Sequence, residues 1–437
     1  MLKQTVFIIT LIATIAAFTY SVSKIIALLN ITKKAYPIKD IWKRIIMTIN
    51  VAFSQSKIFR RPVIGFLHAL VFWGFLVICV GSSEIIFDGV TGSEKVFSSW
   101  GIIYDIITTS GDIFGLLVLI SIIVFLVRRV FMHIKRFYGI EMKKKFHTDA
   151  NIALSIILLL MISLLSMNSS YITFTPSYDV VGTYPVSRFI APYFHGMDFS
   201  VIYVINQVSW WTHILLVFFF ANYLPYSKHF HVFMSIPNVF VSRLEPLGKL
   251  PNMENVTKEV KLMLDTSTAY SATAEAGAEL SRFGVKDVED GTWKNFADSL
   301  SCTQCGRCTS VCPANITGKK LSPRKILMDF RARMKEKGKF LLKDKKYTDN
   351  KSLLRDFISE EEIWACTTCN ACAKECPVNI NHPTLIVDLR RYLVMEEAKA
   401  PSGLNAIFAN IENNGAPWQF SPQDRLLWAN DLCMNKK

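Results

Sequence analysis

Eight cysteines in the second half of the chain stand in two runs that share one spacing, C-x2-C-x2-C-x3-C-P. The first run is Cys302, Cys305, Cys308 and Cys312, and the second is Cys366, Cys369, Cys372 and Cys376. In such a run three closely spaced thiolates bind one cubane iron–sulfur cluster, and the fourth cysteine binds the cluster of the other run. The spacing therefore predicts two [4Fe–4S] clusters, which carry single electrons.

Crossed ligation determines which cysteines are expected to share a cluster. Cluster 1 is predicted to be held by Cys302, Cys305, Cys308 and Cys376, and cluster 2 by Cys366, Cys369, Cys372 and Cys312. The alternatives are zinc and disulfides. Structural zinc usually takes two separated ligand pairs rather than a four-member run, and disulfides require an oxidising compartment. Cys79 and Cys433 stand outside both runs, and we expect neither to be functional.

Five apolar stretches before residue 227 are each long enough to cross a bilayer, which takes about 20 residues. They cover residues 5–29, 63–87, 103–127, 151–174 and 200–226. The rest of the chain is more polar, and its length suits one soluble domain. We therefore predict a mainly α protein, in which a five-helix transmembrane bundle precedes a mostly helical dicluster ferredoxin-like domain. The predicted domains are a transmembrane five-helix bundle at 1–232, a linker and helical segment at 233–295, and a dicluster domain with a partner-docking end at 296–437.

The net charge of +14 comes largely from two segments between the apolar stretches. Residues 30–62 hold eight Lys or Arg and residues 128–150 hold seven, whereas the other two connections hold one each, Lys95 and Arg188. By the positive-inside rule, the N-terminus lies outside and the cysteine runs lie in the cytoplasm. This distribution predicts a multi-pass protein of the inner (plasma) membrane and argues against a nucleic-acid partner. A cleaved signal peptide at 1–30 is the alternative, and the dense basic segment that follows favours a retained helix.

Histidines inside apolar helices are the second group that could do chemistry. His68 is expected about two turns into its span, and His231 lies at the cytoplasmic end of the last one. Two histidines at similar depth on different helices can bind haem b from both axial sides, so we expect this pair, with His229 as a competitor. His213 precedes His231 by about 27 Å of helix. A second haem ligand at the depth of His213 would fall about ten residues after His68, and that position is Ile78. A lone histidine can instead form a hydrogen bond to a neighbouring helix.

Helical patterns also continue through the soluble part. We expect a helix over 255–283, a short helix leading into Cys302, a helix from Pro323 to Gly338, and one over 383–398. The helix expected from Pro323 to Gly338 carries Arg331, Arg333, Lys335 and Lys337. We favour a solvated face for these side chains over a docking site for an acidic partner. No dinucleotide fingerprint, Walker loop or Ser/His/Asp set is evident, so no substrate-transforming site is predicted.

The last span resembles a known family. The stretch from His213 through LPYSKHF to His231 is similar to the last helix of the cytochrome b subunit of respiratory nitrate reductase, a five-span protein with its N-terminus outside. The resemblance implies that His68 and His231 bind the haem nearer the cytoplasm. It also implies that His213 matches the outer haem's ligand on that helix, although Ile78 stands where the partner would be. The resemblance thus implies that the bundle at 1–232 is a cytochrome-b-like domain with one haem b, or two.

The cysteine-rich part resembles the iron–sulfur proteins related to heterodisulfide reductase. The matching elements are CTQCGRC at 302–308, TGKKLSP at 317–323, WACTTC at 364–369 and NIENNGAPW at 410–418. Asn370 stands in the second run where the first run has Gly306. In many such relatives a cysteine-rich catalytic domain with CCG motifs follows. The resemblance therefore implies a partner subunit that carries this domain.

These features predict an electron-transfer subunit of a membrane-bound oxidoreductase complex. Electrons are expected to pass between a quinone pool, haem b, the two clusters, and a cytoplasmic CCG-domain iron–sulfur or flavoprotein subunit. One alternative is a haem-free iron–sulfur subunit that binds quinone directly. Another is a redox-sensing membrane scaffold, although no output domain is evident.

Overall fold

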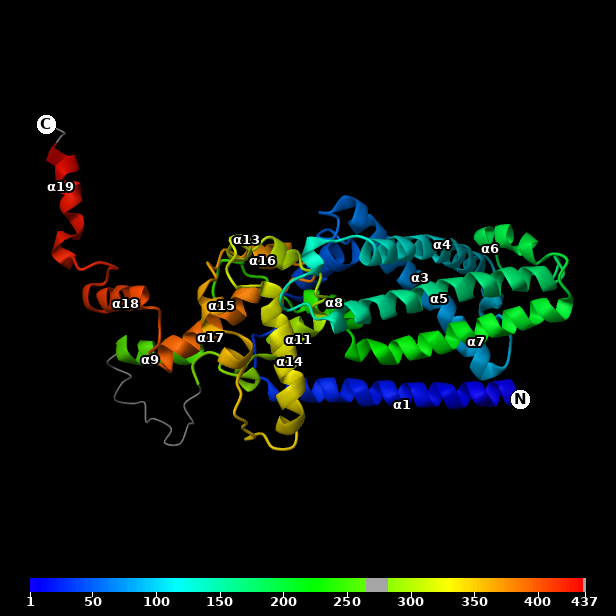
Figure 1. Ribbon diagram of the computed structural model, residues 1–437, viewed down its shortest axis with the longest axis horizontal. Coiled ribbons are helices and arrows are strands. Elements are labelled where there is room, and N and C mark those ends of the chain that lie inside the picture. The colour runs from blue at the N-terminus through cyan, green and yellow to red at the C-terminus, as the bar shows by residue number, and fades with distance from the viewer. Residues whose placement is uncertain (265–281, 435–437) are drawn as a thin grey trace.

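The computed structural model describes residues 1–264 and 282–434 (Figure 1). Within these residues the chain is largely helical and forms no β-strand, with isolated bridges only between Lys33 and Thr292 and between Leu354 and Ile358. The predicted mainly α fold class is therefore confirmed. Of the helix expected over 255–283, α9 (Glu254–Leu264) is seen, and residues 265–281 lie outside the described residues.

Five helices are long and apolar enough to cross a membrane, as the sequence predicted. They are α1 (Leu2–Ile31), α3 (Pro62–Thr91), α4 (Ile102–Val130), α5 (Lys144–Phe174) and α7 (Phe199–Tyr223), the last extended by η5 (Leu224–Tyr226). A helix of 30 residues, such as α1, is about 45 Å long and exceeds a hydrocarbon core of about 30 Å. The five helices lie side by side along the long axis of the molecule (Figure 1).

Small residues let the helices of this bundle approach closely, as is common in membranes. A Cβ atom on Gly74 of α3 would lie 2.5 Å from the Val118 side chain of α4. A Cβ atom on Gly89 would collide in the same way with Phe7 of α1. Large apolar side chains such as Ile106 and Val204 are exposed instead. Their exposure is what a lipid-facing surface requires.

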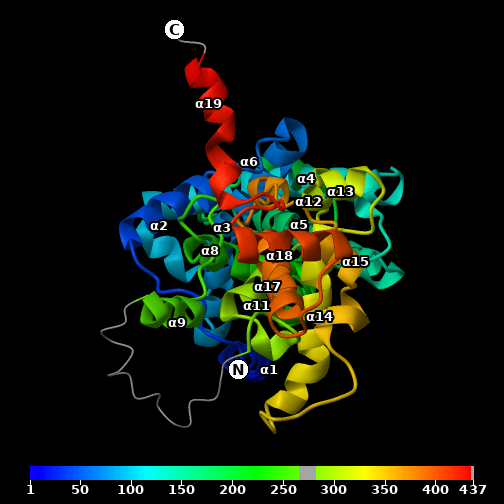
Figure 2. The ribbon, with the colours of Figure 1, turned by 90° about the vertical axis from the view of Figure 1, so that its left-hand side faces the viewer.

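The dicluster domain lies at the end of the bundle where α1 ends and α3 begins (Figure 1). Figure 2 views the molecule from the side of this domain. The other α-helices are α2 (Ile41–Thr48), α6 (Pro185–Ile190), α8 (His231–Phe240), α11 (Trp293–Ser301), α12 (Arg307–Ser310), α13 (Pro313–Ile316), α14 (Pro323–Leu341), α15 (Glu360–Trp364), α16 (Ala371–Glu375), α17 (His382–Met395), α18 (Ser402–Asn414) and α19 (Leu427–Met434). Short π or 3-10 turns are η1 (Ile49–Phe53), η2 (Val96–Trp100), η3 (Lys135–Phe137), η4 (Ala191–Phe194), η6 (Lys228–Phe230), η7 (Val288–Asp290), η8 (Leu353–Phe357) and η9 (Pro422–Leu426).

Helix α14 forms the centre of the domain's core. Ser322 caps its N-terminus by accepting a hydrogen bond from the Lys325 backbone N–H, and Pro323 occupies the first turn, as predicted. The expected stop at Gly338 is wrong, because the helix continues to Leu341. Gly338 instead permits close packing: a Cβ atom there would lie 2.5 Å from Leu28 of α1.

Of the four basic residues of α14 for which the sequence favoured a solvated face, Lys335 is exposed as predicted and the other three are not. Arg331, Arg333 and Lys337 are all buried. Arg333 binds Asp287 with an Nη2–Oδ2 distance of 2.7 Å, and Lys337 binds the same carboxylate at 2.9 Å. Arg331 donates to the Ser227 backbone carbonyl at the end of the bundle. The prediction is wrong for these three residues because their partners lie far away in the sequence, whereas the side chains look solvated when read along their own helix.

Candidate iron–sulfur sites and membrane histidines

The first group of cysteines surrounds one pocket, called here the proximal site. It contains Cys302, Cys305, Cys308 and Cys376. Three of them come from the chain around α12, and Cys376 comes from the C-terminal end of α16 in the second run. The pocket holds about 330 Å³ of space, its opening to solvent included. The structure thus brings the fourth cysteine of one run to the first three of the other.

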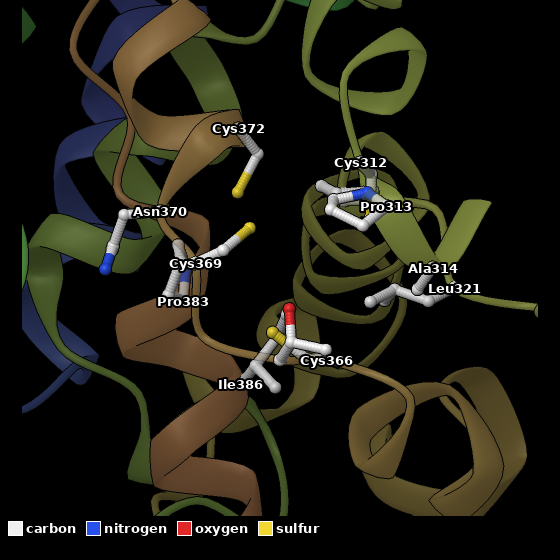
Figure 3. Close-up of a pocket in the computed structure, with 12 residues that line it drawn as sticks. Cys312, Pro313, Ala314, Leu321, Cys366, Cys369, Asn370, Cys372, Pro383 and Ile386 are labelled. Carbon is white, nitrogen blue, oxygen red and sulfur yellow. The ribbon is translucent and has the colours of Figure 1, made fainter. Parts of the chain in front are cut away.

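The second group surrounds a matching pocket, called here the distal site. It contains Cys312, Cys366, Cys369 and Cys372, around about 320 Å³ of space. In Figure 3, Cys369 and Cys372 point into this space from one side, and Cys312 lies across from them. The two pockets therefore have the same donor set and nearly the same size. Their grouping of cysteines is the one that crossed ligation requires.

Left-handed residues recur at equivalent places in the two runs. Gln304 and Thr368 precede the second cysteine of their runs with φ of 59° and 54°. Gly306 and Asn370 follow that cysteine with φ of 74° and 60°. Asparagine tolerates this region better than most side chains do, which explains how Asn370 can stand where the first run has glycine. The repeated turns wrap each run around its pocket.

Gly306 must be glycine for a second reason. A Cβ atom on it would collide with the backbone carbonyl of Arg136, which lies in the connection between α4 and α5. The first run is therefore pressed against a loop of the membrane bundle. For Asn370 a side chain is accommodated, and its amide donates to the Thr368 carbonyl at 2.9 Å.

Burial of the thiols fits a bound cluster. Burial raises the pKa of Cys302 to about 11, and that of Cys372 and Cys376 to about 12. Such thiols stay protonated at neutral pH unless a bound metal deprotonates them. Among the described residues no group of three or more His, Cys, Asp or Glu side chains converges on a single ion. Four thiolates around a cubane do not need to converge, because each binds a different iron.

The connection between α1 and α3 holds the proximal site against the bundle. Arg307 donates to the carbonyls of Lys57 and Ile58 at 2.9 and 3.3 Å. The Lys57 ammonium donates to the Cys376 carbonyl at 3.2 Å and to Asn379 at 2.6 Å. The basic residues of this connection therefore bind the dicluster domain, in addition to any role in topology.

A buried ion pair joins the second basic connection to the same site. Arg324 and Glu141 pair at 2.7 Å with side chains 1% and 4% exposed. Arg324 also donates to the carbonyls of Arg136 and Tyr138, and Ser322 donates to Glu141 at 2.8 Å. Because Arg324 lines the proximal pocket, this pair links the α4–α5 connection directly to the site.

The histidines separate into two depths. His68 of α3 and His231 at the start of α8 lie within electrostatic range of each other. His68 also has a buried Nδ1 atom with no hydrogen-bond partner among the described residues. Burial lowers the pKa of His231 to about 4, so its ring is neutral at pH 7. The ring of His229 lies 5.7 Å from that of His231, so the predicted competitor is close by as well.

His213 lies apart from this pair, buried between α7 and α5. Its Nδ1 atom lies 3.1 Å from the Leu160 carbonyl and 3.2 Å from the Ser163 hydroxyl. Its Nε2 atom is buried without a partner among the described residues. Ile78, the position of its missing counterpart, packs in an apolar cluster around Val118 and Ile122. Among the described residues, the groups seen to act on the His213 ring are Leu160 and Ser163, and no histidine is among them.

Sequence reasoning missed three residues that line the proximal pocket. Arg307 and Arg324 are 5% and 1% exposed, and His382 is 1% exposed. Arg307 could have been predicted to line the pocket, because it directly precedes Cys308 in the sequence. Arg324 and His382 could not be found in this way, because their place in the pocket depends on how α14 and α17 pack.

Comparison with known proteins supports the cysteine-rich part most directly. Residues 301–380 match the family model of the 4Fe-4S dicluster domain. The probable iron-sulfur-binding oxidoreductase FadF of Bacillus subtilis is 30% identical over 413 residues, which cover 88% of this chain and 54% of that protein. The EtfAB:quinone oxidoreductase of Syntrophomonas wolfei is 28% identical over 415 residues, covering 87% and 53%. One component of the dihydromethanophenazine:CoB–CoM heterodisulfide reductase of Methanosarcina acetivorans is 33% identical over 149 residues, covering 32% and 35%.

The chain thus spans about half the length of the first two relatives. No solved structure matches it. The chain is iron–sulfur oxidoreductase-like, carries a dicluster domain, and is similar to heterodisulfide reductase subunits, as the cysteine runs and their surroundings predicted.

Proposed function

We propose that this chain transfers single electrons between a soluble oxidoreductase partner and quinone in the inner membrane, through two [4Fe–4S] clusters and haem b. The observation that carries the proposal is the attachment of a two-pocket cysteine domain to the end of a membrane bundle. Residues of the proximal pocket bind the loops of the bundle, whereas the distal pocket is lined in part by α17. When bound, the clusters supply one-electron carriers at these two places.

We place the domain in the cytoplasm and the N-terminus outside. Support comes from the fifteen Lys and Arg residues in the two connections on the domain's side of the bundle, eight and seven, against two on the other side. The Syntrophomonas wolfei relative is named an EtfAB:quinone oxidoreductase, that is, for EtfAB and quinone. We adopt the same two classes of partner here, and the sequence resemblance adds a CCG-domain subunit as the soluble one.

The C-terminal arm, residues 402–434, is the segment that we assign to partner docking. Helices α18 and α19 extend away from the rest of the molecule (Figure 1). Trp418, Phe420 and Trp428 on this arm are 59%, 68% and 64% exposed. Exposed aromatic side chains in one segment are typical of a protein-binding surface. The arm follows α17, whose Pro383 and Ile386 line the distal pocket.

The function is tested by electron transfer into a bilayer. Full-length protein in anaerobic liposomes that contain menaquinone is reduced from outside with dithionite, and quinol formation is followed by ultraviolet absorbance. We expect the wild type to reduce quinone and a Cys376→Ala variant, which lacks a proximal-site ligand, to lose at least about tenfold in rate. Protein-free liposomes give the background rate. Clusters that accept electrons without any quinol formation would favour the redox-sensing scaffold.

Within this function, we propose that one haem b is bound by His68 and His231. The support is their nearness, the unpartnered Nδ1 atom of His68 and the neutral ring of His231. We expect one haem per chain in the wild type, none in His68→Ala, and an unchanged amount in His213→Ala. A pyridine haemochrome assay measures each. Full haem content in His68→Ala would disprove the pairing, and no haem in the wild type would favour direct quinone binding.

A further inference from the structure

The two cysteine pockets match in donors and size but differ in the charges around them. The proximal pocket is lined by Arg307 and Arg324, both nearly fully buried. The residues that line the distal pocket include no charged side chain. They are Cys312, Pro313, Ala314, Leu321, Pro323, Cys366, Thr367, Cys369, Asn370, Cys372, Pro383 and Ile386 (Figure 3).

Further cations surround the proximal cysteines. Lys57 donates to the Cys376 backbone carbonyl at 3.2 Å. Arg136 is within electrostatic range of Cys305, and Arg331 of Cys302. All of these cations come from the basic connections of the bundle or from the buried face of α14.

Arg390 is the cation seen beside the distal site. It donates to the backbone carbonyls of Cys366 and Ile363, and it lies over the ring of Trp364 at 4.9 Å. It does not line the pocket. Among the described residues, the distal site therefore has one neighbouring cation, which lies outside its pocket, whereas several cations line or adjoin the proximal pocket.

Nearby carboxylates do not cancel this difference. Glu141 neutralises Arg324, and Glu375 lies 3.6 Å from Arg60. The hydrogen bonds seen for Arg307 go to two backbone carbonyls, and no carboxylate pairs with it directly among the described residues, although Glu375 acts on it at longer range. Arginine stays protonated in proteins, so this charge persists at every physiological pH.

Positive charge near a buried redox centre favours its reduced form. A cubane with four thiolates is already anionic, and reduction adds a further negative charge. Net charge and hydrogen bonding around the cluster are among the factors that set its reduction potential. In a buried site of low effective dielectric, a fixed cation acts strongly.

We propose that Arg307 and the cations around it give the proximal site a higher reduction potential than the distal site. The chain thereby favours electron movement from its partner-facing end toward the membrane. In this step one electron leaves the distal site and one arrives at the proximal site, so the transfer balances within the chain. The inference rests on the proposed function for its direction, while the order of potentials can be measured without it.

The test is a redox titration of the purified full-length protein, followed by electron paramagnetic resonance. A Cys312→Ala variant, which keeps all four proximal ligands and lacks one of the four distal ones, identifies the proximal signal. We expect this signal to appear at higher potential than the distal one in the wild type. Chemical reductants are used without quinone or partner, so the result stands even if the protein does not reduce quinone. Equal potentials, or reduction of the distal site first, would overturn the proposal.

Arg307→Gln tests the cause of the difference. We expect the reduced-to-oxidised ratio of the proximal site at a fixed potential to fall about tenfold, which corresponds to about 59 mV for one electron. Arg307→Lys should restore most of the ratio, and the distal signal should not move. Arg355→Gln, at an exposed arginine that lines neither pocket, is the matched control.

Lys57→Gln provides a second variant should Arg307→Gln fail to bind both clusters. It removes a cation that contacts the Cys376 backbone without lining the pocket. A smaller drop of the same sign, about threefold, is expected at the proximal site alone. An unchanged ratio in both Lys57→Gln and any folded Arg307 variant would show that these cations do not set the potential.

Discussion

Cys312→Ala is expected to empty the distal site and leave the proximal site intact, although Cys312 belongs to the first cysteine run. The reason is spatial: Cys312 lines the pocket that also contains Cys366, Cys369 and Cys372. Alanine offers no atom that can bind iron, so this site loses one of four ligands. Non-haem iron should fall from about eight to about four atoms per chain.

The identity of the surviving centre decides between crossed and uncrossed ligation. Under crossed ligation, the paramagnetic resonance signal of Cys312→Ala matches that of Cys369→Ala and differs from that of Cys305→Ala. If it matches Cys305→Ala instead, each run binds its own cluster. Cys79→Ala is the control, because this exposed cysteine of α3 lies outside both pockets. It should keep both signals and all of the iron.

The sequence predicted the local features of the molecule well, because they depend on short spacings. The five spans follow from continuous apolar runs, and the structure places their bounds within four residues of the predicted ones, except that the fourth helix begins at Lys144 and not at residue 151. The cysteine spacing predicted which thiols lie together, because a cubane constrains its ligands wherever the rest of the chain goes. The assignment of these cysteines as ligands stays a prediction until the variants are measured.

Long-range packing could not be predicted in the same way. Arg333 and its partner Asp287 are 46 residues apart, and Arg324 and Glu141 are 183 apart. No periodicity within one helix shows that its arginines will be covered by distant acids. The sequence likewise predicts a helix stop at Gly338, because glycine commonly ends helices. Its actual role is to pack against Leu28 of α1, which lies near the other end of the chain and cannot be seen in the local sequence. The charged surroundings of the proximal site were missed for this reason.

Glu141→Gln is expected to destabilise the contact between the dicluster domain and the membrane bundle by about 3–5 kcal/mol, because it leaves Arg324 buried without a counter-charge. The remaining hydrogen bonds of Arg324 go to the carbonyls of Arg136 and Tyr138, which cannot compensate a full charge. The proximal site should be lost first when denaturant is added, because Arg324 lines it. Resonance signals recorded along a denaturant series measure the loss of each site separately.

The matched control for this variant is Glu361→Gln, which removes the carboxylate of an exposed pair with Lys320. The two ion pairs have similar lengths, 2.7 and 2.6 Å, but the exposed side chains of the control pair are 65% and 55% accessible. Water and salt screen such a pair, so its loss should cost no more than about 1 kcal/mol. Equal sensitivity of the two variants to denaturant would show that burial of the Glu141 pair does not hold the domain to the bundle. A large shift for Glu141→Gln alone, with early loss of the proximal signal, would establish that the α4–α5 connection supports the proximal site structurally, in addition to any role in topology.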